Sequence, residues 1–445
     1  MKKINSSENI TYPGPESKKI ISVIRELEGS GTRTFVTDPP PMVLKSAKGA
    51  RLKDPDGNEY LDLFGGYAVA NVGHGHPKVI EAICAQAREL IHCTSAFCNP
   101  VRANLMQKIA EIAPKGLNRI LLGVTGTQAN EVAFNLSTTR SNKKEIIAFH
   151  GGYFGRSNAM VAISGTARIR ARLGIEPRAH FVPYPYCYRC SFGGCDNTNE
   201  CKVIDYIEEM LSSPASGVGN VAAIFAEPIL GSGGVVVPPD GFLRKLSQAC
   251  KEHDVLLVLD EIQVGFGRTG RMWASEHDEI VPDLMTIGKG IGGGLPVSAV
   301  LGREELMNFW EPDIHTTTFL TNPLIHSAAI AAIEVMQEEQ IWKNSAELGK
   351  VLLNTLISEL DGHALVGEIR GKGLYVGIEM VNDKKKKTPA KEEVKKVQSQ
   401  AKEMGLVLGL AGYYGNVIRI CPPLTITRSE LETALEKLIY IFKHM

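Results

Sequence analysis

The chain has little that would direct it to nucleic acid, a membrane or an oxidising compartment. Its 445 residues include 49 Lys and Arg and 49 Asp and Glu, so the net charge is zero and no basic surface for nucleic acid is expected. No apolar run is long enough to span a membrane, and the first thirty residues lack the apolar stretch of a secretion signal. We therefore expect a cytoplasmic protein that binds neither membranes nor nucleic acids.

Cysteine is scarce and odd in number, which argues against general disulfide pairing. Of nine cysteines, four cluster in one loop-like segment, at Cys187, Cys190, Cys195 and Cys201. Four thiols this close could hold zinc, but their spacing is not the paired CxxC pattern of a standard zinc site. Reduced thiols, a disulfide and a structural zinc remain open alternatives, and we expect reduced thiols and no metal.

The composition is that of an ordinary globular protein with a large core. Hydrophobic residues make up 44% of the chain and charged residues 22%. Short strand-like runs rich in Val, Ile and Leu alternate with amphipathic helical patterns, which predicts a mostly parallel, doubly wound α/β sheet. The predicted strands are 119–122, 145–148, 221–225, 255–259, 284–287 and 297–301, with helices at 129–136 and 242–253 between them.

The last part of the chain has a different pattern, which predicts a smaller α+β domain. Helices are expected over 323–337, 341–360, 391–404 and 428–444, with strand-like segments between them. An N-terminal hairpin, over 42–47 and 50–54, should join this small domain. The predicted division is an N-terminal segment at 1–60, a large domain at 61–325 and a small domain at 326–445.

Three segments carry the residues on which chemistry could depend. Lys289 follows a buried strand and enters a run of glycines, so it could be a desolvated amine able to form a Schiff base, or a surface lysine. Asp260 ends an apolar strand, where a carboxylate could pair with a protonated ring nitrogen or cap a helix. Gly126 and Thr127 open a helix after a strand, which suits a phosphate. Together the three match what pyridoxal phosphate requires.

The order of these segments resembles the class III pyridoxal-phosphate aminotransferases, over nearly the whole chain. The strongest matches are LVLDEIQVGFGRTGRMWA (257–274) and PDLMTIGKGIGGGLPVSAV (282–300). Further blocks follow the family's order, including VTGTQANEVA, FHGGYFGRS, AEPILGSGG, TTTFLTNP and VIRICPPLTI. The resemblance extends to 4-aminobutyrate, ornithine and alanine–glyoxylate aminotransferases. It implies fold type I, with pyridoxal 5'-phosphate bound in the large domain.

The resemblance assigns cofactor-binding roles residue by residue. Lys289 corresponds to the Schiff-base lysine, which also moves the substrate proton, and Asp260 to the acid that keeps the ring nitrogen protonated. Gln263 corresponds to the side chain that contacts the phenolic oxygen of the ring. Gly126 and Thr127 correspond to the phosphate cradle.

Three further positions match residues at the edge of the family's cofactor site. Tyr153 corresponds to the aromatic residue that stacks on the ring, although core packing would also explain it. Thr318 corresponds to a threonine that reaches the phosphate in the neighbouring subunit, which implies a homodimer with shared active sites. A tetramer built of such dimers also fits. Glu227 is expected to order the site near Gln263.

The substrate-binding positions follow the family less closely. Arg419 corresponds to the arginine that binds the α-carboxylate, and Arg156 to a residue for a second carboxylate, or to a structural ion pair. Ornithine and 4-aminobutyrate aminotransferases usually carry a glutamate where this chain has Ser232, so Arg419 should stay open. Tyr67 looks like the tyrosine of ornithine aminotransferase, whereas Ser232 is similar to dialkylglycine decarboxylase. Phe154 stands where many members have histidine.

We therefore expect an enzyme that moves an amino group from an α- or ω-amino donor to a keto acid such as 2-oxoglutarate or pyruvate, with ping-pong kinetics. The alternatives on the same scaffold are an amino-acid racemase and a dialkylglycine-type decarboxylase. A non-catalytic cofactor-binding protein would not need Lys289, Asp260 and both arginines together. A nicotinamide dehydrogenase would need a glycine-rich turn followed by an acidic residue about twenty positions later, and the sequence has no such pair.

Overall fold

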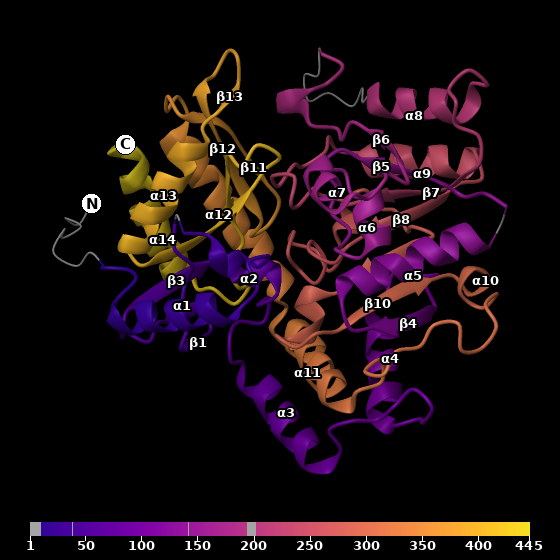
Figure 1. The fold of residues 1–445 in the computed structure, drawn as a ribbon, viewed down its shortest axis with the longest axis horizontal. Helices are drawn as coiled ribbons and strands as arrows, with labels where there is room; N and C mark the ends of the chain where they lie inside the picture. The colour runs from indigo at the N-terminus through magenta and orange to yellow at the C-terminus, as the bar shows by residue number, and fades with distance from the viewer. Residues whose placement is uncertain (1–9, 38, 141, 194–201) are drawn as a thin grey trace.

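The computed structural model describes residues 10–37, 39–140, 142–193 and 202–445. Two sheets organise these residues, and Figure 1 shows them side by side, with the chain's N-terminal and C-terminal parts together in one half. The larger half contains a seven-stranded sheet in the order β4-β10-β9-β8-β7-β5-β6. Its strands are β4 (Arg119–Gly123), β5 (Glu145–Phe149), β6 (His180–Val182), β7 (Val221–Ala226), β8 (Leu256–Asp260), β9 (Leu284–Ile287) and β10 (Ser298–Gly302).

This sheet is mostly parallel, which confirms the predicted fold class. The neighbouring pairs β6–β5, β5–β7, β7–β8 and β8–β9 are parallel, whereas β10 runs antiparallel to both β9 and β4. Every residue of β7 is buried, as expected for a strand covered by helices on both faces. Helix α5 (Gly126–Thr139) packs against one face of the sheet, and α8 (Lys202–Ser212) and α9 (Phe242–Glu252) pack together in a separate apolar cluster.

The smaller half contains an eight-stranded sheet in the order β1-β2-β3-β14-β15-β12-β11, with β13 paired to β12. The strands are β1 (Ser46–Lys48), β2 (Arg51–Lys53), β3 (Glu59–Leu63), β11 (Val366–Gly371), β12 (Val376–Asp383), β13 (Thr388–Pro389), β14 (Leu406–Ala411) and β15 (Val417–Ile420). The N-terminal hairpin joins this sheet because β3 pairs in parallel with β14, with Leu61 opposite Leu406. We retain 1–60, 61–325 and 326–445 as a proposed division, although β3 extends across its first boundary.

Helices of the C-terminal part begin and end close to the expected ranges. They are α11 (Pro323–Glu339), α12 (Ile341–Leu360), α13 (Lys391–Glu403) and α14 (Arg428–Lys443). Helix α14 begins at a capping box, in which the Thr427 hydroxyl accepts from the Glu430 amide and the Glu430 carboxylate accepts from the Thr427 amide. The apolar faces of α12 and α14 share one core with the small sheet.

The remaining helices connect and cover these layers. They are α1 (Pro15–Leu27), α2 (Gly65–Ala68), α3 (Pro77–Glu89), α4 (Pro100–Ile112), α6 (Asn158–Ile163), α7 (Ala167–Leu173) and α10 (Glu304–Met307). Helix α11 packs against both α3 and α4 below the two sheets (Figure 1). Within the described ranges, none of these helices is both long and apolar enough to cross a membrane.

The cysteine-rich segment is only partly described. Cys187 begins a single 3₁₀ turn, Cys187–Arg189, and Cys190 follows it, whereas Cys195 and Cys201 lie outside the described residues. The state of the four-cysteine cluster therefore stays a prediction.

Candidate active site

The predicted chemical residues gather at one edge of the large sheet. Asp260 is the last residue of β8, Lys289 follows the end of β9, and Gly126 and Thr127 begin α5 directly after β4. These three strands run in the same direction, so their carboxyl ends share an edge, which is where ligands bind in doubly wound sheets. Sequence positions far apart are thereby brought to one site.

Asp260 is buried and its carboxylate is held by two donors. The Asn130 side-chain amide donates to one oxygen at 2.7 Å, and the Ile262 backbone amide donates to the other at 2.9 Å. Thr286 donates to the Asn130 carbonyl oxygen at 2.8 Å, which fixes the orientation of the Asn130 amide. Burial raises the pKa of Asp260, while the Asn130 hydrogen bond and the nearby Lys289 amine oppose the rise.

Lys289 lies at the start of a 3₁₀ turn, with φ of 46°. Burial lowers the pKa of its amine, while the charges of Asp260 and Glu227 oppose this effect. Among the described residues, no hydrogen bond or ion pair to the Lys289 amine is present. A partly buried amine without a bonding partner beside two carboxylates can act as a nucleophile and as a proton carrier.

Glu227 directly follows β7 and ties two loops of the site together. Its carboxylate accepts from the Tyr153 amide at 2.9 Å and from the Gly231 amide at 2.8 Å. Burial, and secondarily the charge of Asp260, raise the pKa of Glu227 to about 8. Gly231 also lies against Gln263, since a Cβ at Gly231 would come within 2.1 Å of Gln263 Oε1. Gly231 therefore lies between the Glu227 carboxylate, which its amide binds, and the Gln263 side chain.

Gly126 and Thr127 form the first turn of α5, where backbone amides point out of the helix. Thr125 caps the helix by accepting from the Gln128 amide, which leaves the amides of Gly126 and Thr127 outside the helical hydrogen bonds. Gly126 packs closely on Ile262, because a Cβ there would lie 3.0 Å from the Ile262 side chain. Such a helix start can bind a phosphate.

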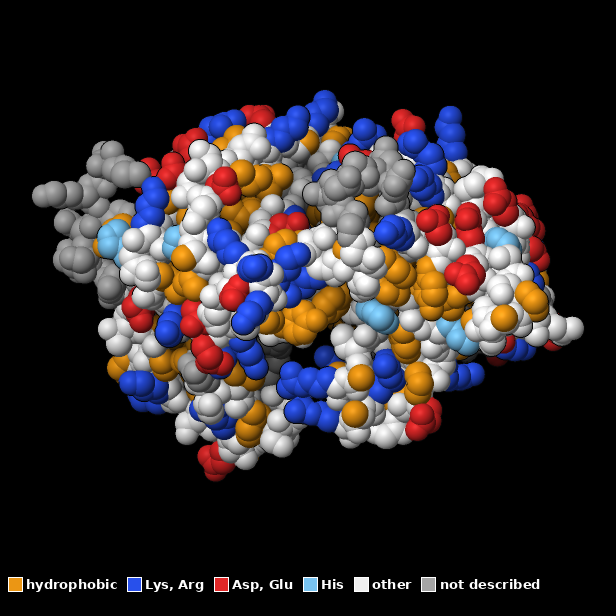
Figure 2. Space-filling model, turned by 90° about the horizontal axis from the view of Figure 1, so that it is seen from above, with side chains coloured by type: hydrophobic (Ala, Val, Ile, Leu, Met, Phe, Trp, Pro, Cys, Tyr) orange, Lys and Arg blue, Asp and Glu red, His pale blue; other side chains and the backbone are white. Residues whose placement is uncertain are grey.

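Tyr153 and Arg156 lie together at an exposed part of the site. The Tyr153 side chain is 38% exposed, and the Arg156 guanidinium lies over its ring at 5.4 Å. The Arg156 amide donates to Thr127 Oγ1 at 3.4 Å, which connects this segment to the start of α5. Figure 2 shows a hollow near the middle of one face of the molecule, with Lys and Arg side chains around it.

Arg419 lies in β15, on the small sheet, and is 1% exposed. Its Nε and Nη2 atoms have no hydrogen-bond partner among the described residues. The guanidinium lies 5.0 Å from the Tyr67 ring and 5.7 Å from the Phe64 ring. Buried donors are normally paired, so the free atoms of Arg419 indicate a place for an anionic ligand.

Tyr67 is held by an unusual backbone turn. Residues 65–68 all have positive φ, including Tyr67 at 65° and Ala68 at 64°. This conformation is costly for residues with side chains and persists where surrounding contacts enforce it. Here the Tyr67 carbonyl accepts from Gln263 Nε2 at 3.1 Å, which connects the turn to the segment that follows β8.

Two predicted residues are not brought into contact with the others by their side chains. Ser232 is exposed. Its backbone carbonyl accepts a hydrogen bond from the Gly412 amide at 3.1 Å. Thr318 is exposed in the segment that precedes α11. Its predicted role concerns a second subunit, so it stays a prediction.

The sequence reasoning did not single out three residues of the site. Asn130 and Thr286 support Asp260, and the Tyr375 hydroxyl lies against Gly231. Asn130 lies on the buried face of α5, next to Ala129 and Ala133, and a polar residue at such a helical position could have been noticed. Thr286 lies inside the predicted strand of β9, where only the fold shows its contact with Asn130. No local pattern marks Tyr375.

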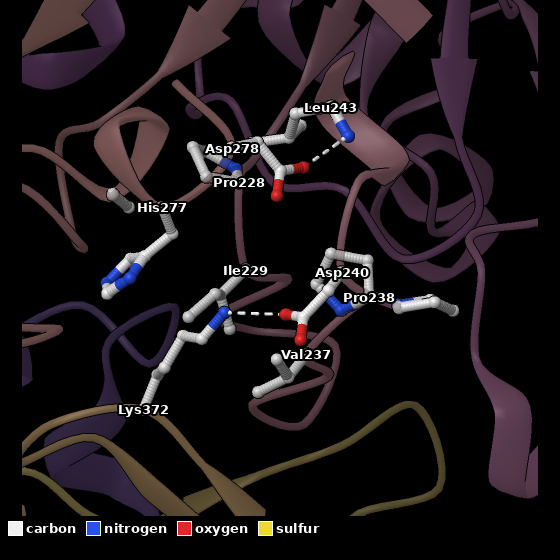
Figure 3. Close-up of a pocket in the computed structure, with 11 residues that line it drawn as sticks. Pro228, Ile229, Val237, Pro238, Asp240, Leu243, His277, Asp278 and Lys372 are labelled. Carbon is white, nitrogen blue, oxygen red and sulfur yellow. Dashed lines mark hydrogen bonds and ion pairs between the residues drawn. The ribbon is translucent and has the colours of Figure 1, made fainter. Parts of the chain in front are cut away.

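A pocket lined by Pro228, the residue after Glu227, lies between the loops drawn in Figure 3. Its polar groups are engaged, because Lys372 pairs with Asp240 at 3.1 Å and Asp278 accepts from the Leu243 amide at 2.8 Å. Burial, followed by the charges of Lys372 and Arg271, lowers the pKa of His277 to about 4. The pocket is therefore a junction between the two halves, and we do not assign it a ligand.

Known proteins resemble this chain over most of its length. The family model described as Aminotransferase class-III matches residues 35–442. A leucine/methionine racemase of Thermococcus litoralis is 38% identical over 89% of this chain and 90% of its own length. An acetylornithine aminotransferase of Methanopyrus kandleri is also 38% identical, over 89% and 93%. The solved ornithine aminotransferase of Toxoplasma gondii, with partial occupancy of PLP at its active site, superposes with a TM-score of 0.84 at 32% identity, over 96% of this chain and 94% of that one.

Proposed function

The chain belongs to the class III aminotransferases, enzymes that depend on pyridoxal phosphate, and from this we propose that it moves an amino group from an amino acid to a keto acid such as 2-oxoglutarate or pyruvate. The observation that carries the proposal is the meeting of a partly buried amine and a buried carboxylate at adjacent strand ends. A Lys289 amine without a bonding partner lies beside an Asp260 carboxylate held by Asn130 and Ile262.

The residues present fit pyridoxal phosphate. The free amides of Gly126 and Thr127 would hold its phosphate, Asp260 its ring nitrogen, Gln263 its phenolic oxygen and Lys289 its aldehyde carbon. Tyr153 would cover the ring, and Glu227 would keep the Tyr153 amide and the Gly231 loop in place. When bound, the cofactor supplies an electron-withdrawing ring that stabilises negative charge at the substrate carbon next to nitrogen.

The protein's own groups do the remaining work. A protonated ring nitrogen would offset the desolvation cost of the buried Asp260 carboxylate. This explains why a carboxylate is present in an apolar environment. Because burial lowers its pKa, Lys289 gives up its proton at Nζ more readily than an exposed lysine and can move a proton to and from the substrate carbon. Arg419 would bind the α-carboxylate through its unpaired Nε and Nη2.

The same arrangement favours two separate half-reactions. The amino donor and the keto acceptor both carry a carboxylate, and Arg419 is the buried guanidinium with free donors in the site. If both substrates use Arg419, they must bind in turn, which is the basis of ping-pong kinetics. Ser232 offers no carboxylate to occupy Arg419, so donors with a carboxylate next to the reacting amine are favoured, while ω-amino donors would place their distal carboxylate at Arg156.

A racemase is the second candidate, because one similar protein is a leucine/methionine racemase. Racemisation and transamination share the removal of the proton from the α-carbon. They differ in whether the proton returns to that carbon from the other side. A dialkylglycine-type decarboxylase stays a further alternative, because Ser232 is similar to the serine of that enzyme and release of CO₂ would replace release of a proton.

We also propose a cytoplasmic homodimer with active sites at the subunit interface. The proposal is based on Thr318, which corresponds to a residue that would reach the cofactor phosphate of the partner subunit. Exposed apolar side chains next to it, Phe319 and Ile314, are suited to burial against a second copy. Sedimentation equilibrium should give twice or four times the chain mass, and a monomer would contradict the proposal.

The function is tested by titrating the visible band of the holoenzyme with single amines, before any keto acid is added. The panel is alanine, glutamate, ornithine, 4-aminobutyrate, β-alanine and 2-aminoisobutyrate. We expect at least one donor to bleach the band and a keto acid to restore it. Loss of optical activity without a keto acid would instead identify a racemase, and CO₂ release from 2-aminoisobutyrate a decarboxylase. Failure of all three assays would contradict the proposal.

A further inference from the structure

Arg370, Gly377 and Arg419 form one row across the small sheet. Gly377 of β12 lies opposite Arg370 of β11 on one side and opposite Arg419 of β15 on the other. Residues directly opposite in neighbouring strands project from the same face. The two arginines therefore stand on one face of the sheet, with a glycine between them, and the loop 231–235 of the large half lies against Arg370 and Gly377 in this row.

Arg370 binds that loop with its whole guanidinium. Its Nε donates to the Val235 carbonyl at 3.0 Å and its Nη2 to the Gly234 carbonyl at 2.5 Å. Its Nη1 bonds the carboxylates of Glu368 at 2.5 Å and Glu379 at 2.8 Å. Arg370 is 8% exposed. The planar fork thus joins two backbone carbonyls of one half to two carboxylates of the other.

Gly377 provides the space into which the loop fits. A Cβ at Gly377 would lie 3.1 Å from the Gly234 carbonyl oxygen and 3.1 Å from the Val235 Cβ. Both distances are tighter than ordinary Cβ contacts, so a larger residue would push the loop away from the sheet. Val235 itself has φ of 54°, a conformation that a β-branched residue adopts only when its surroundings enforce it.

The other end of the loop lies beside Arg419. Gly231 lies against the Tyr375 hydroxyl, which a Cβ there would approach to 2.8 Å. Tyr375 directly precedes β12, whose first residue Val376 pairs with Ile420, the residue after Arg419, and the Arg419 charge opposes the rise in the Tyr375 pKa that burial causes. Ser232 lies between this end and the end held by Arg370. Its distance from Arg419 therefore depends on where Arg370 holds the loop.

We propose that Arg370 is a positioning residue that sets the place of the Ser232 loop over Arg419 and thereby determines the affinity of the site for substrate carboxylates. The inference rests on the proposed function, in which Arg419 binds the carboxylate. Arg370 touches neither substrate nor cofactor in this account. It acts through the loop 231–235, for which Gly377 leaves room.

Two variants separate this role from a general contribution to stability. Arg370→Lys keeps a positive charge beside Glu379 but loses the fork that binds both carbonyls. Gly377→Ala leaves Arg370 unchanged but adds a methyl group that pushes the loop 231–235 away from the sheet. Arg428→Lys is the matched control, because Arg428, at the start of α14, makes an exposed ion pair with Glu347 of α12. The visible band of each holoenzyme shows first that it is folded and loaded.

The measurement is the dissociation constant of propionate, a carboxylic acid without an amine, determined by calorimetry on each holoenzyme. We expect about tenfold weaker binding in Arg370→Lys and in Gly377→Ala, with an unchanged constant in the control. The KM of the preferred amino acid should rise by a similar factor, with little change in kcat.

Equal propionate binding in wild type and both folded variants would overturn the inference and leave the proposed function standing. Wild-type protein that binds no carboxylate would overturn both. If Arg370→Lys does not fold, Gly377→Ala takes its place in the comparison. Unfolding of both variants would also overturn the inference, since a positioning role requires a folded enzyme in which carboxylate affinity is selectively reduced.

Discussion

Arg370 and Arg419 stand on one face of the small sheet, separated by Gly377, yet their guanidinium groups have opposite surroundings. Arg370 bonds two carboxylates and two carbonyls, whereas Arg419 leaves Nε and Nη2 without partners among the described residues. A buried guanidinium whose N–H groups all donate hydrogen bonds within the protein has a structural role. One with N–H groups left unpaired can bind a ligand. The surroundings alone therefore distinguish the proposed positioning residue from the proposed substrate-binding residue.

Replacement of Lys289 by alanine should abolish turnover. The amine is the proposed covalent attachment point and proton carrier, and general acid–base groups contribute about 10²–10⁴-fold by themselves. We expect kcat to fall by at least about a thousandfold and the visible band of the holoenzyme to shift to that of non-covalently bound cofactor. Lys372→Ala, which removes an exposed ion pair with Asp240, is the control. A near-normal rate in Lys289→Ala would refute the mechanism.

Asn130→Ala should weaken cofactor binding without unfolding the protein. The substitution removes a 2.7 Å donor from the buried Asp260 carboxylate, and hydrogen bonds to charged groups contribute roughly 1.5–3 kcal/mol. We expect the cofactor dissociation constant to rise about tenfold or more, measured by equilibrium dialysis. Asn308→Ala, which removes an exposed hydrogen bond to Glu304, should leave it unchanged. An unchanged constant in Asn130→Ala would show that Asp260 does not depend on this donor.

Ser232→Glu should reduce the affinity for α-amino acids. A carboxylate on this loop could pair with Arg419 and compete with the substrate carboxylate, as the resemblance to ornithine and 4-aminobutyrate aminotransferases suggests. We expect the KM of the preferred α-amino acid to rise about tenfold, which corresponds to about 1.4 kcal/mol. Ser232→Gln has nearly the same size without the charge and serves as the control. Equal KM values in the two variants would argue against competition for Arg419.

His326 should make stability fall at acidic pH. It is fully buried in α11, its Nε2 lies 3.1 Å from the Leu320 carbonyl, and burial lowers its pKa from 6.5 to about 4. The unfolded state binds this proton more readily, so the stabilisation is complete above about pH 6.5 and is lost as pH falls through 4. The loss amounts to about 3 kcal/mol.

The check is urea unfolding of wild type and His326→Gln at pH 7 and pH 4.5. The variant should be less stable at pH 7 but should lose less stability between the two values. Parallel losses in both proteins would show that His326 is not responsible, and His277, whose pKa is also lowered to about 4, would be examined next.

The cysteine cluster is tested by elemental analysis of protein purified without added metal. We expect no stoichiometric zinc and a thiol at Cys190, which is partly exposed, that reacts with a thiol reagent. One zinc per chain that survives dialysis would instead assign the cluster to a structural metal.

Local sequence was sufficient for most strands of the large sheet and for placing the proposed cofactor-binding residues at its ligand-binding edge. Strands such as β7 and β8 are short apolar runs, and a residue at the end of a parallel strand is placed at the ligand-binding edge by the strand itself. That is why the positions of Asp260, Lys289 and Gly126 could be predicted from the chain alone. The three-residue strand β6 and the reversed direction of β10 left no comparable signal, because strand pairing is decided by neighbours distant in sequence.

Only the tertiary structure decided how the remaining residues are used. Asn130 and Asp260 are far apart along the chain and meet because α5 packs on the large sheet. Arg370 and Arg419 look alike in sequence, and they differ only through strand register and the loop that passes over Gly377. Helix and strand patterns are local, whereas register, packing and the partners of a buried charge depend on contacts that form only when the whole chain folds.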